Sequence, residues 1–176
     1  MRRKGSRLAQ YSVLKTTLLV VGEGADDKAF ITHMKNVFCP RGCGLSVKVE
    51  AGDGGSPGNI ITNAMRSFKS AEYGRRILIL DADVPPTDVQ RKKASDGGYE
   101  IILWSPQCLE GALLDVLGER VAQYETSQEL KDRLHPKLKA YHTDPKAYEP
   151  LFPKTVLEET ENYSVAKVRT YLRPKQ

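Results

Sequence analysis

Three acidic residues stand where apolar segments of the sequence end. Glu23 closes the stretch that begins with the apolar run of residues 17–21, and Asp81 and Asp83 close the apolar run that starts at residue 75. Open α/β sheets gather functional groups at the carboxyl ends of their strands, so we expect these carboxylates at one edge. Alternate residues of a strand point to the same face. Asp81 and Asp83 therefore face one way, provided that the strand persists to residue 83.

Three carboxylates at neighbouring strand ends repel one another in a half-buried cleft unless a cation joins them. A hard divalent cation with oxygen ligands is the simplest such partner. Mg²⁺ takes one or two carboxylates, keeps water and uses substrate phosphate for its remaining ligands. The pattern therefore predicts phosphoryl chemistry. The residues alone leave open the alternative that these acids end their strands as solvated turn formers.

The two glycines beside Glu23 do not form a nucleotide-binding loop. A dinucleotide fingerprint needs a third glycine, and Asp27 stands at that position after Gly22 and Gly24. The phosphate loop of NTPases also fails, because no Gly-Lys-Ser/Thr sequence follows this loop or the glycine-rich segment 52–58. Asp26 and Asp27 are equally well explained as first-turn residues of a helix, where acidic side chains are favoured.

Weaker candidates surround these carboxylates in the sequence. Glu110 follows Pro106 at the start of an expected helix, where it is either a further metal ligand or a first-turn acid. Asp27 is a second possible addition to the site. Basic side chains could hold phosphate groups, although each is also explained by a solvated helix face. These candidate phosphate-binding residues are Lys28, Arg75, Arg91 and Lys92.

Apolar runs alternate with segments of helical period, which is typical of an α/β fold. We expect a small open, mainly parallel four-stranded sheet with helices on both faces and right-handed crossovers. The expected strands are 17–21, 45–50, 75–83 and 99–105, and the expected helices lie in 25–38, 59–70, 84–95 and 106–118. Residues 119–176 are expected to form two or three helices, broken at Pro136, Pro145, Pro150 and Pro153, that pack on the sheet domain of residues 16–118.

Composition excludes some classes of protein. The chain has 176 residues, a formal charge of +5, 40% hydrophobic and 28% charged residues, which is ordinary for a globular domain. No apolar run approaches the roughly 20 residues of a membrane span. The basic arm of residues 1–15 has no apolar segment behind it, so we expect no secretory signal and a cytoplasmic protein. Cys39, Cys43 and Cys108 are expected as thiols rather than as a disulfide framework.

Two stretches together resemble the Toprim domain. "LLVVGEGADDKAF" followed by "RILILDAD" is similar to the glutamate-glycine turn and the Asp-x-Asp strand end of that family, and "WSPQCLEGALLD" resembles its OLD-like and RloB-like nuclease branch. The resemblance covers roughly residues 16–118. It implies that Glu23 is catalytic, that Asp81 and Asp83 bind metal, and that Gly24 is the family's glycine.

Two positions depart from the family pattern. Many topoisomerase-like members continue to a third aspartate where this chain has Pro85, so the chain fits the shorter motif of the nuclease branch. The residue before the glutamate is Gly22 where the family usually has valine.

The resemblance implies a nuclease or nuclease subunit that uses Mg²⁺ or Mn²⁺ to hydrolyse phosphodiester bonds in DNA or RNA. Anti-phage defence is the expected setting, and an ATPase or further copies of the chain are the expected partners. Two alternatives remain at this point. One is a Toprim-like module that binds nucleic acid or regulates with little catalysis, and the other is a phosphohydrolase acting on small phosphoesters.

Overall fold

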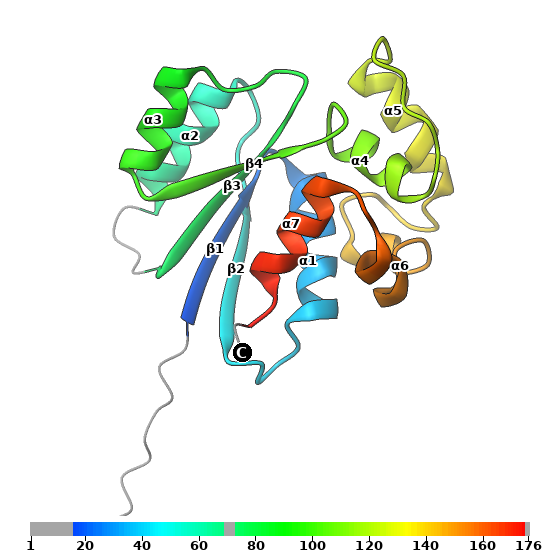
Figure 1. The fold of residues 1–176 in the computed structure, drawn as a ribbon, viewed down its shortest axis with the longest axis horizontal. Coiled ribbons are helices and arrows are strands. Elements are labelled where there is room, and N and C mark those ends of the chain that lie inside the picture. The colour runs from blue at the N-terminus through cyan, green and yellow to red at the C-terminus, as the bar shows by residue number, and fades with distance from the viewer. Residues whose placement is uncertain (1–15, 69–72, 175–176) are drawn as a thin grey trace, which may run out of the picture.

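A four-stranded parallel sheet forms the centre of the protein (Figure 1). The computed structural model describes residues 16–68 and 73–174, so the predicted basic arm of residues 1–15 lies outside the described residues. The strands lie in the order β2-β1-β3-β4, and every neighbouring pair is parallel. They are β1 (Thr16–Gly22), β2 (Leu45–Ala51), β3 (Arg75–Asp81) and β4 (Tyr99–Trp104). The predicted α/β fold is confirmed.

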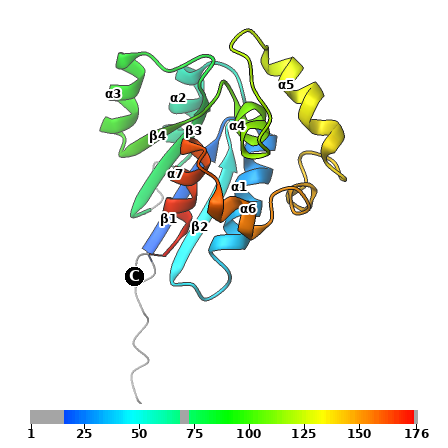
Figure 2. The same ribbon diagram turned by 45° about the vertical axis from the view of Figure 1, so that its right-hand side comes forward.

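Helices cover both faces of this sheet (Figures 1 and 2). One face packs against α1 (Ala25–Phe38) and α7 (Tyr163–Leu172), and the other against α2 (Pro57–Ser67) and α3 (Asp88–Asp96). Successive strand residues alternate between the two cores, because a strand points its side chains to opposite faces. In β1, Leu18 belongs to the first core and Leu19 to the second.

Two elements near the sheet edge differ from the sequence prediction. β3 ends at Asp81, two residues before the predicted end at Asp83. The helix predicted from residue 106 is α4 (Leu109–Val116). Gln107 adopts a φ of 63°, in the left-handed region, so the chain turns before the helix begins. Pro106 therefore lies outside the helix that it was predicted to start.

The segment after α4 joins the core of the sheet domain. Its helical elements are α5 (Ser127–Leu134), η1 (His135–Lys137), η2 (Pro145–Tyr148), α6 (Lys154–Glu159) and α7. Leu130, Tyr148, Leu157 and Val168 are all buried in the same hydrophobic cluster as Phe30 of α1. One core therefore extends from the sheet through α1 to the last helix.

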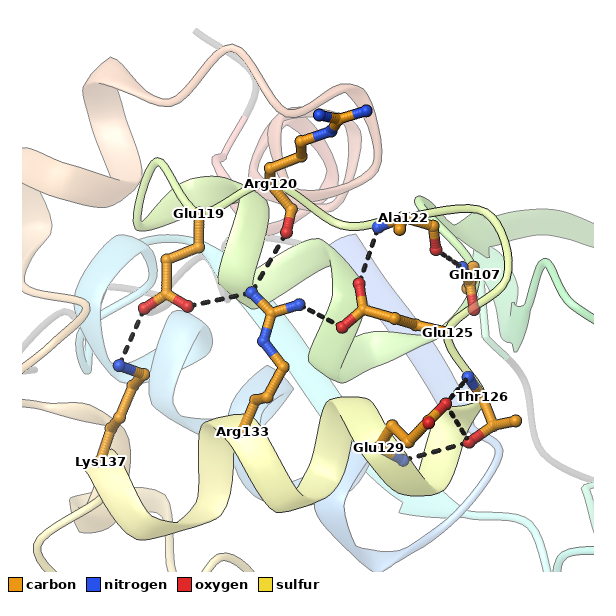
Figure 3. Close-up of polar contacts among 9 residues, drawn as sticks. All are labelled: Gln107, Glu119, Arg120, Ala122, Glu125, Thr126, Glu129, Arg133 and Lys137. Carbon is orange, nitrogen blue, oxygen red and sulfur yellow. Dashed lines mark hydrogen bonds and ion pairs between the residues drawn. The ribbon is translucent and has the colours of Figure 1, made fainter.

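Ion pairs hold α5 against the loop that follows α4 (Figure 3). The Arg133 guanidinium binds the carboxylates of Glu125 and Glu119, with 3.1 Å from Nη2 to Glu119 Oε2. The same nitrogen donates to the Arg120 carbonyl at 3.1 Å. Lys137 Nζ lies 2.9 Å from Glu119 Oε1, so each acid in this group has a cationic partner.

The loop between α1 and β2 contradicts the expectation of three thiols. Cys39 and Cys43 form a disulfide, with their Cα atoms 5.6 Å apart, while Cys108 is a free, buried thiol. The loop turns back on itself over four residues and brings the two Cα atoms within the usual range for a disulfide. Spacing alone does not show that turn.

Across residues 16–68 and 73–174, every helix is too short or too polar to cross a membrane.

Candidate metal centre

Glu23 and Asp81 meet at the carboxyl edge of the sheet. β1 and β3 are adjacent and parallel, so their carboxyl ends lie side by side. Asp81 is the last residue of β3, and Glu23 directly follows β1. The backbone N–H of Asp81 donates to Glu23 Oε2 at 3.1 Å, which holds the Glu23 side chain across the end of the neighbouring strand. The structure therefore brings together these two predicted site residues.

Gly22 allows α1 to approach this strand end closely. A Cβ atom at position 22 would collide with the Cβ of Asp27. Asp27 is buried, its Oδ2 accepts from the Gly24 N–H at 3.0 Å, and its Oδ1 accepts from Trp104 Nε1–H at 2.7 Å. Both Asp27 oxygens are thus engaged by protein donors. Asp27 fixes the turn that presents Glu23, and the glycine that departs from the family pattern makes that contact possible.

The amino-terminal end of α4 reaches the same edge. The N–H of Leu109, the first residue of α4, donates to Asp81 Oδ1 at 3.3 Å. Unpaired N–H groups of a first helical turn carry partial positive charge and favour an acidic partner. Glu110, the next residue, is buried in spite of its charge. It lines the same pocket as Asp81, so the structure places this weaker candidate within the site.

These side chains surround one pocket of about 250 Å³. That volume suits an ion with a few waters and a phosphate group better than a large ligand, since drug-sized pockets start at about 300 Å³. The charged groups that line the pocket are Glu23, Asp26, Asp27, Asp81, Glu110 and Lys131.

Burial and mutual repulsion raise the pKa values of the pocket acids. Burial first, and then the charges of Asp27, Glu23 and Glu110, raise the pKa of Asp81 to about 9. Burial also raises the pKa of Asp27 to about 7, although the hydrogen bond from Trp104 opposes this shift. The pKa of Glu23 is raised mainly by burial. Protons compensate part of the negative charge at neutral pH, and a divalent cation would displace them.

Lys131 of α5 brings a positive charge to this pocket. Burial lowers the pKa of its ammonium group, but Glu110, Asp26 and Asp81 raise it by more, so the net shift is upward. Lys131 therefore stays charged beside the carboxylates. Lys131 lies in the segment after residue 118, outside the motifs from which the site was predicted.

The residues present fit a hard divalent cation. The pocket acids supply oxygen ligands, which Mg²⁺ and Mn²⁺ prefer. Their pKa values are raised first by burial and then by neighbouring acids, and the charge of Lys131 does not cancel these shifts. Glu23 and Asp81 would hold the ion, with Glu110 beside them. Asp27 would not, because its oxygens already accept hydrogen bonds from Gly24 and Trp104.

Asp83 lies apart from this pair. β3 ends at Asp81, so the condition for the two aspartates to share a strand face is not met. Asp83 is exposed, its Oδ2 accepts from Ser127 Oγ at 2.6 Å, and its N–H donates to the Gln107 carbonyl at 2.8 Å. Its charge still contributes to the raised pKa values of Glu23 and Asp81. Asp83 is not among the residues that line the pocket, and its role as a metal ligand stays a prediction.

The predicted phosphate-binding cations lie outside the pocket lining. Lys28 pairs with Glu50 at 3.2 Å, and Lys92 pairs with Asp96 at 2.9 Å. Arg75 stands at the opposite end of β3 from Asp81, with its guanidinium carbon 4.4 Å from the centre of the Tyr171 ring. Arg91 is exposed on α3.

Comparison of the chain with protein-family models, with curated proteins and with solved structures gave no match. The resemblance to Toprim domains rests on its sequence motifs, and the functions that it implies are proposals.

Proposed function

We propose that the protein is a Mg²⁺- or Mn²⁺-dependent nuclease, or the nuclease subunit of a larger assembly, that hydrolyses phosphodiester bonds in DNA or RNA. One observation carries the proposal. Glu23 and Asp81 are hydrogen-bonded to each other at adjacent strand ends, in a pocket whose acids have raised pKa values and which also holds Lys131. Acids arranged in this way are typical of sites that bind a catalytic cation.

The bound ion would supply Lewis-acid stabilisation of charge on the scissile phosphate. Asp81 is positioned for its part by the Leu109 N–H and by its place at the end of β3. Glu23 uses Oε2 to accept from the Asp81 N–H, which leaves Oε1 for the ion or for a water molecule. Glu23, whose pKa is raised by burial, would accept a proton from an attacking water. Lys131 would pair with a non-bridging phosphate oxygen.

The proposed setting is the cytoplasm, in anti-phage defence. The pocket lies on a chain of 176 residues with a formal charge of +5, which favours phosphate-rich polymers but leaves little surface to select among them. Substrate choice would then come from an ATPase partner or from further copies of the chain.

Hydrolysis of a small phosphoester is a second candidate, and two observations favour it. The pocket measures about 250 Å³, which a single phosphate group with a small substituent would fill. Lys28, Arg75, Arg91 and Lys92 lie outside its lining, so they do not form a track that leads a polymer into it.

A cleavage assay separates these functions. The full chain is incubated with labelled single- and double-stranded DNA and RNA, with and without Mg²⁺ or Mn²⁺, and in parallel with small phosphomonoesters and phosphodiesters. We expect metal-dependent cleavage of a nucleic acid that is lost in Glu23→Gln and in Asp81→Asn. Asp96→Asn is the matched control, because Asp96 is an exposed acid paired with Lys92 on α3.

Each other outcome identifies a different function. Turnover of a small ester without cleavage of any polymer supports the second candidate. Salt-sensitive binding of nucleic acid without cleavage indicates a binding or regulatory module. Cleavage that survives both Glu23→Gln and Asp81→Asn would show that the site is misplaced. Asp83→Asn tests whether Asp83 also holds the ion. If it does, this variant should lose activity as well.

A further inference from the structure

A second group of ligand-type side chains lies beside the pocket, and the proposed nuclease chemistry does not use it. Asp26 stands in the first turn of α1, His135 follows α5, and His142 lies in the loop before η2. One potential ligand atom from each residue lies within 4.8 Å of those of the other two. The first turn of α1 therefore meets two histidines from the segment after α5, and Asp26 and His142 are 116 positions apart in sequence.

The contacts within this group leave one nitrogen unsatisfied. His142 Nδ1 lies 2.6 Å from Asp26 Oδ1, in a hydrogen bond. His135 Nε2 lies 3.7 Å from Asp26 Oδ2 and 3.4 Å from Glu110 Oε1, too far for a good hydrogen bond to either oxygen. This nitrogen is shielded from solvent and lacks a hydrogen-bond partner among the described residues. A buried polar atom without a partner destabilises the fold, so this arrangement favours a further ligand at this nitrogen.

The donor set selects the kind of ligand. Two imidazole nitrogens and a carboxylate oxygen suit borderline divalent transition metals such as Zn²⁺, whereas Mg²⁺ prefers oxygen ligands alone. In a tetrahedral zinc site the ligand atoms lie about 3.4 Å apart, given bonds of about 2.1 Å. The distances of 3.4 Å and 3.7 Å around His135 Nε2 are close to that separation. Glu110 adds a second carboxylate oxygen, 3.4 Å from His135 Nε2.

We propose that Asp26, His135 and His142 form a binding site for a transition-metal ion of the Zn²⁺ class, with Glu110 as the nearest further ligand. The site is distinct from the Glu23–Asp81 centre in its ligand chemistry, although Asp26 and Glu110 also line the pocket of that centre. It joins the start of α1 to the segment after α5. Metal bound there would fasten that segment to the wall of the pocket.

Binding has a structural consequence that can be observed. The His135 and His142 rings are stacked, with centroids 4.2 Å apart and planes inclined by 9°. A metal ion lies in the plane of each imidazole that binds it, so two parallel rings cannot share an ion without turning. Metal binding must therefore separate the stack and replace the hydrogen bond between Asp26 and His142.

The test uses the full chain after treatment with a chelator. Zn²⁺ is titrated in competition with a chromophoric chelator, and Co²⁺ serves as a spectroscopic substitute. We expect one equivalent of Zn²⁺ to bind. His135→Ala and His142→Ala should each weaken binding roughly 100-fold, and Asp26→Asn roughly 10-fold, by comparison with the losses of about 10- to 100-fold that follow changes around metal ligands. Equal affinity in the wild type and in the double histidine variant would overturn the proposal.

Two controls separate this site from others. Glu23→Gln and Asp81→Asn should retain Zn²⁺ affinity, so failure of the proposed nuclease activity and failure of the zinc site are independent results. Cys43→Ser should also retain it under reducing conditions, which open the Cys39–Cys43 disulfide, and loss of Zn²⁺ binding in that variant would place the ion at the cysteine thiolates instead.

The wild-type protein provides a test that does not depend on the variants folding. The chain has three histidines, and the third, His33, is buried with its Nε2 2.7 Å from the Phe152 carbonyl oxygen. Zn²⁺ should shift the imidazole NMR signals of His135 and His142 and leave those of His33 in place. Zinc binding without movement of the first two signals would refute the assignment.

Discussion

Two groups of carboxylates lie near α5, and their pKa values move in opposite directions. Glu119 and Glu125 have lowered pKa values, because Lys137 and Arg133 bind the first, and the Ala122 N–H and Arg133 bind the second (Figure 3). Asp81 and Glu23 have raised pKa values, because they are buried among other acids. α5 contributes one cation to each group: Arg133 to the first and Lys131 to the second.

The difference separates acids that the protein pairs with its own cations from acids that are buried beside one another. Around Arg133 the charges are balanced by the protein itself, so a further cation has little to gain there. In the pocket, burial and mutual repulsion raise the pKa values of the acids, and a bound cation would favour their charged forms. The number of nearby acids does not distinguish the two groups. The balance of charge around the acids distinguishes the two groups.

The largest expected effect is on activity. Asp81→Asn should reduce metal-dependent cleavage at least 1,000-fold, on the order of the loss of a main electrostatic contributor, while slightly stabilising the metal-free protein. Glu119→Gln should leave the cleavage rate unchanged. Single-turnover rates and thermal unfolding of both variants provide the measurement. A comparable loss of activity in Glu119→Gln would end the distinction between the two groups.

The second effect is a dependence of stability on pH. The pKa of Asp81 is about 9 in the folded protein and 3.8 in the unfolded chain. Its protonated form therefore stabilises the fold fully below pH 3.8, and this stability is lost as the pH rises toward about 9. The thermal midpoint of the metal-free protein should therefore fall by roughly 5 °C between about pH 6 and about pH 9. Saturating Mg²⁺ should reverse the fall, and Asp81→Asn should flatten it. Asp27, whose pKa is raised to about 7, adds to the lower part of this window, and Glu119 and Glu125 titrate below it. A slope above about pH 8 that survives in Asp81→Asn would therefore argue against Asp81 as its origin.

The third effect compares two acids at equivalent helix positions. Asp27 is the third residue of α1, and Glu129 is the third residue of α5. Each carboxylate accepts a hydrogen bond from the backbone N–H of the residue that precedes its helix, which is Gly24 for Asp27 and Thr126 for Glu129. Asp27→Asn turns an amide N–H toward the Gly24 N–H in a buried site and should cost about 1–3 kcal/mol of unfolding free energy. Glu129→Gln keeps an acceptor at the surface and should cost only a few tenths of the free energy that Asp27→Asn costs. Urea unfolding measures both.

The smallest expected effect concerns Glu119 and Glu125, whose charges are balanced by Arg133 and Lys137. Arg133→Met should lower the thermal midpoint by roughly 1–3 °C, because partly exposed ion pairs contribute little. The loss should shrink further at high salt, which already screens these charges. A large loss that does not depend on salt would show that Arg133 acts through packing rather than through charge.

Sequence patterns located Glu23 and Asp81 because strand ends leave a local signal: an apolar run followed by an acid. The same rule placed Asp83 beside them, but β3 stops at Asp81 and the chain turns toward Ser127. Strand length depends on packing beyond the strand itself. The alternation of strands and helices followed from periodicity, which is why the parallel sheet with helices on both faces was predicted correctly, whereas the strand order β2-β1-β3-β4 was not predicted.

Lys131, His135 and His142 left no comparable signal. They lie in a segment where lysine and proline are frequent, and only the packing of α5 against α4 and of the following loop against α1 brings them to the pocket. Surface cations such as Arg91 and Lys92 look the same in the sequence as a pocket lysine. Tertiary contact decides which of them meets an acid.

The crowding of Gly22 against Asp27 predicts how the turn tolerates substitution. In a library that varies both glycines beside Glu23, survivors should keep glycine at position 22, because any other residue adds an atom that displaces Asp27. Position 24 has ordinary extended backbone and only a 3.8 Å neighbour for an added Cβ, so serine and alanine should survive there. The glycine that is constrained is thus the one in front of the glutamate, and chains with the same turn are best sought by that residue.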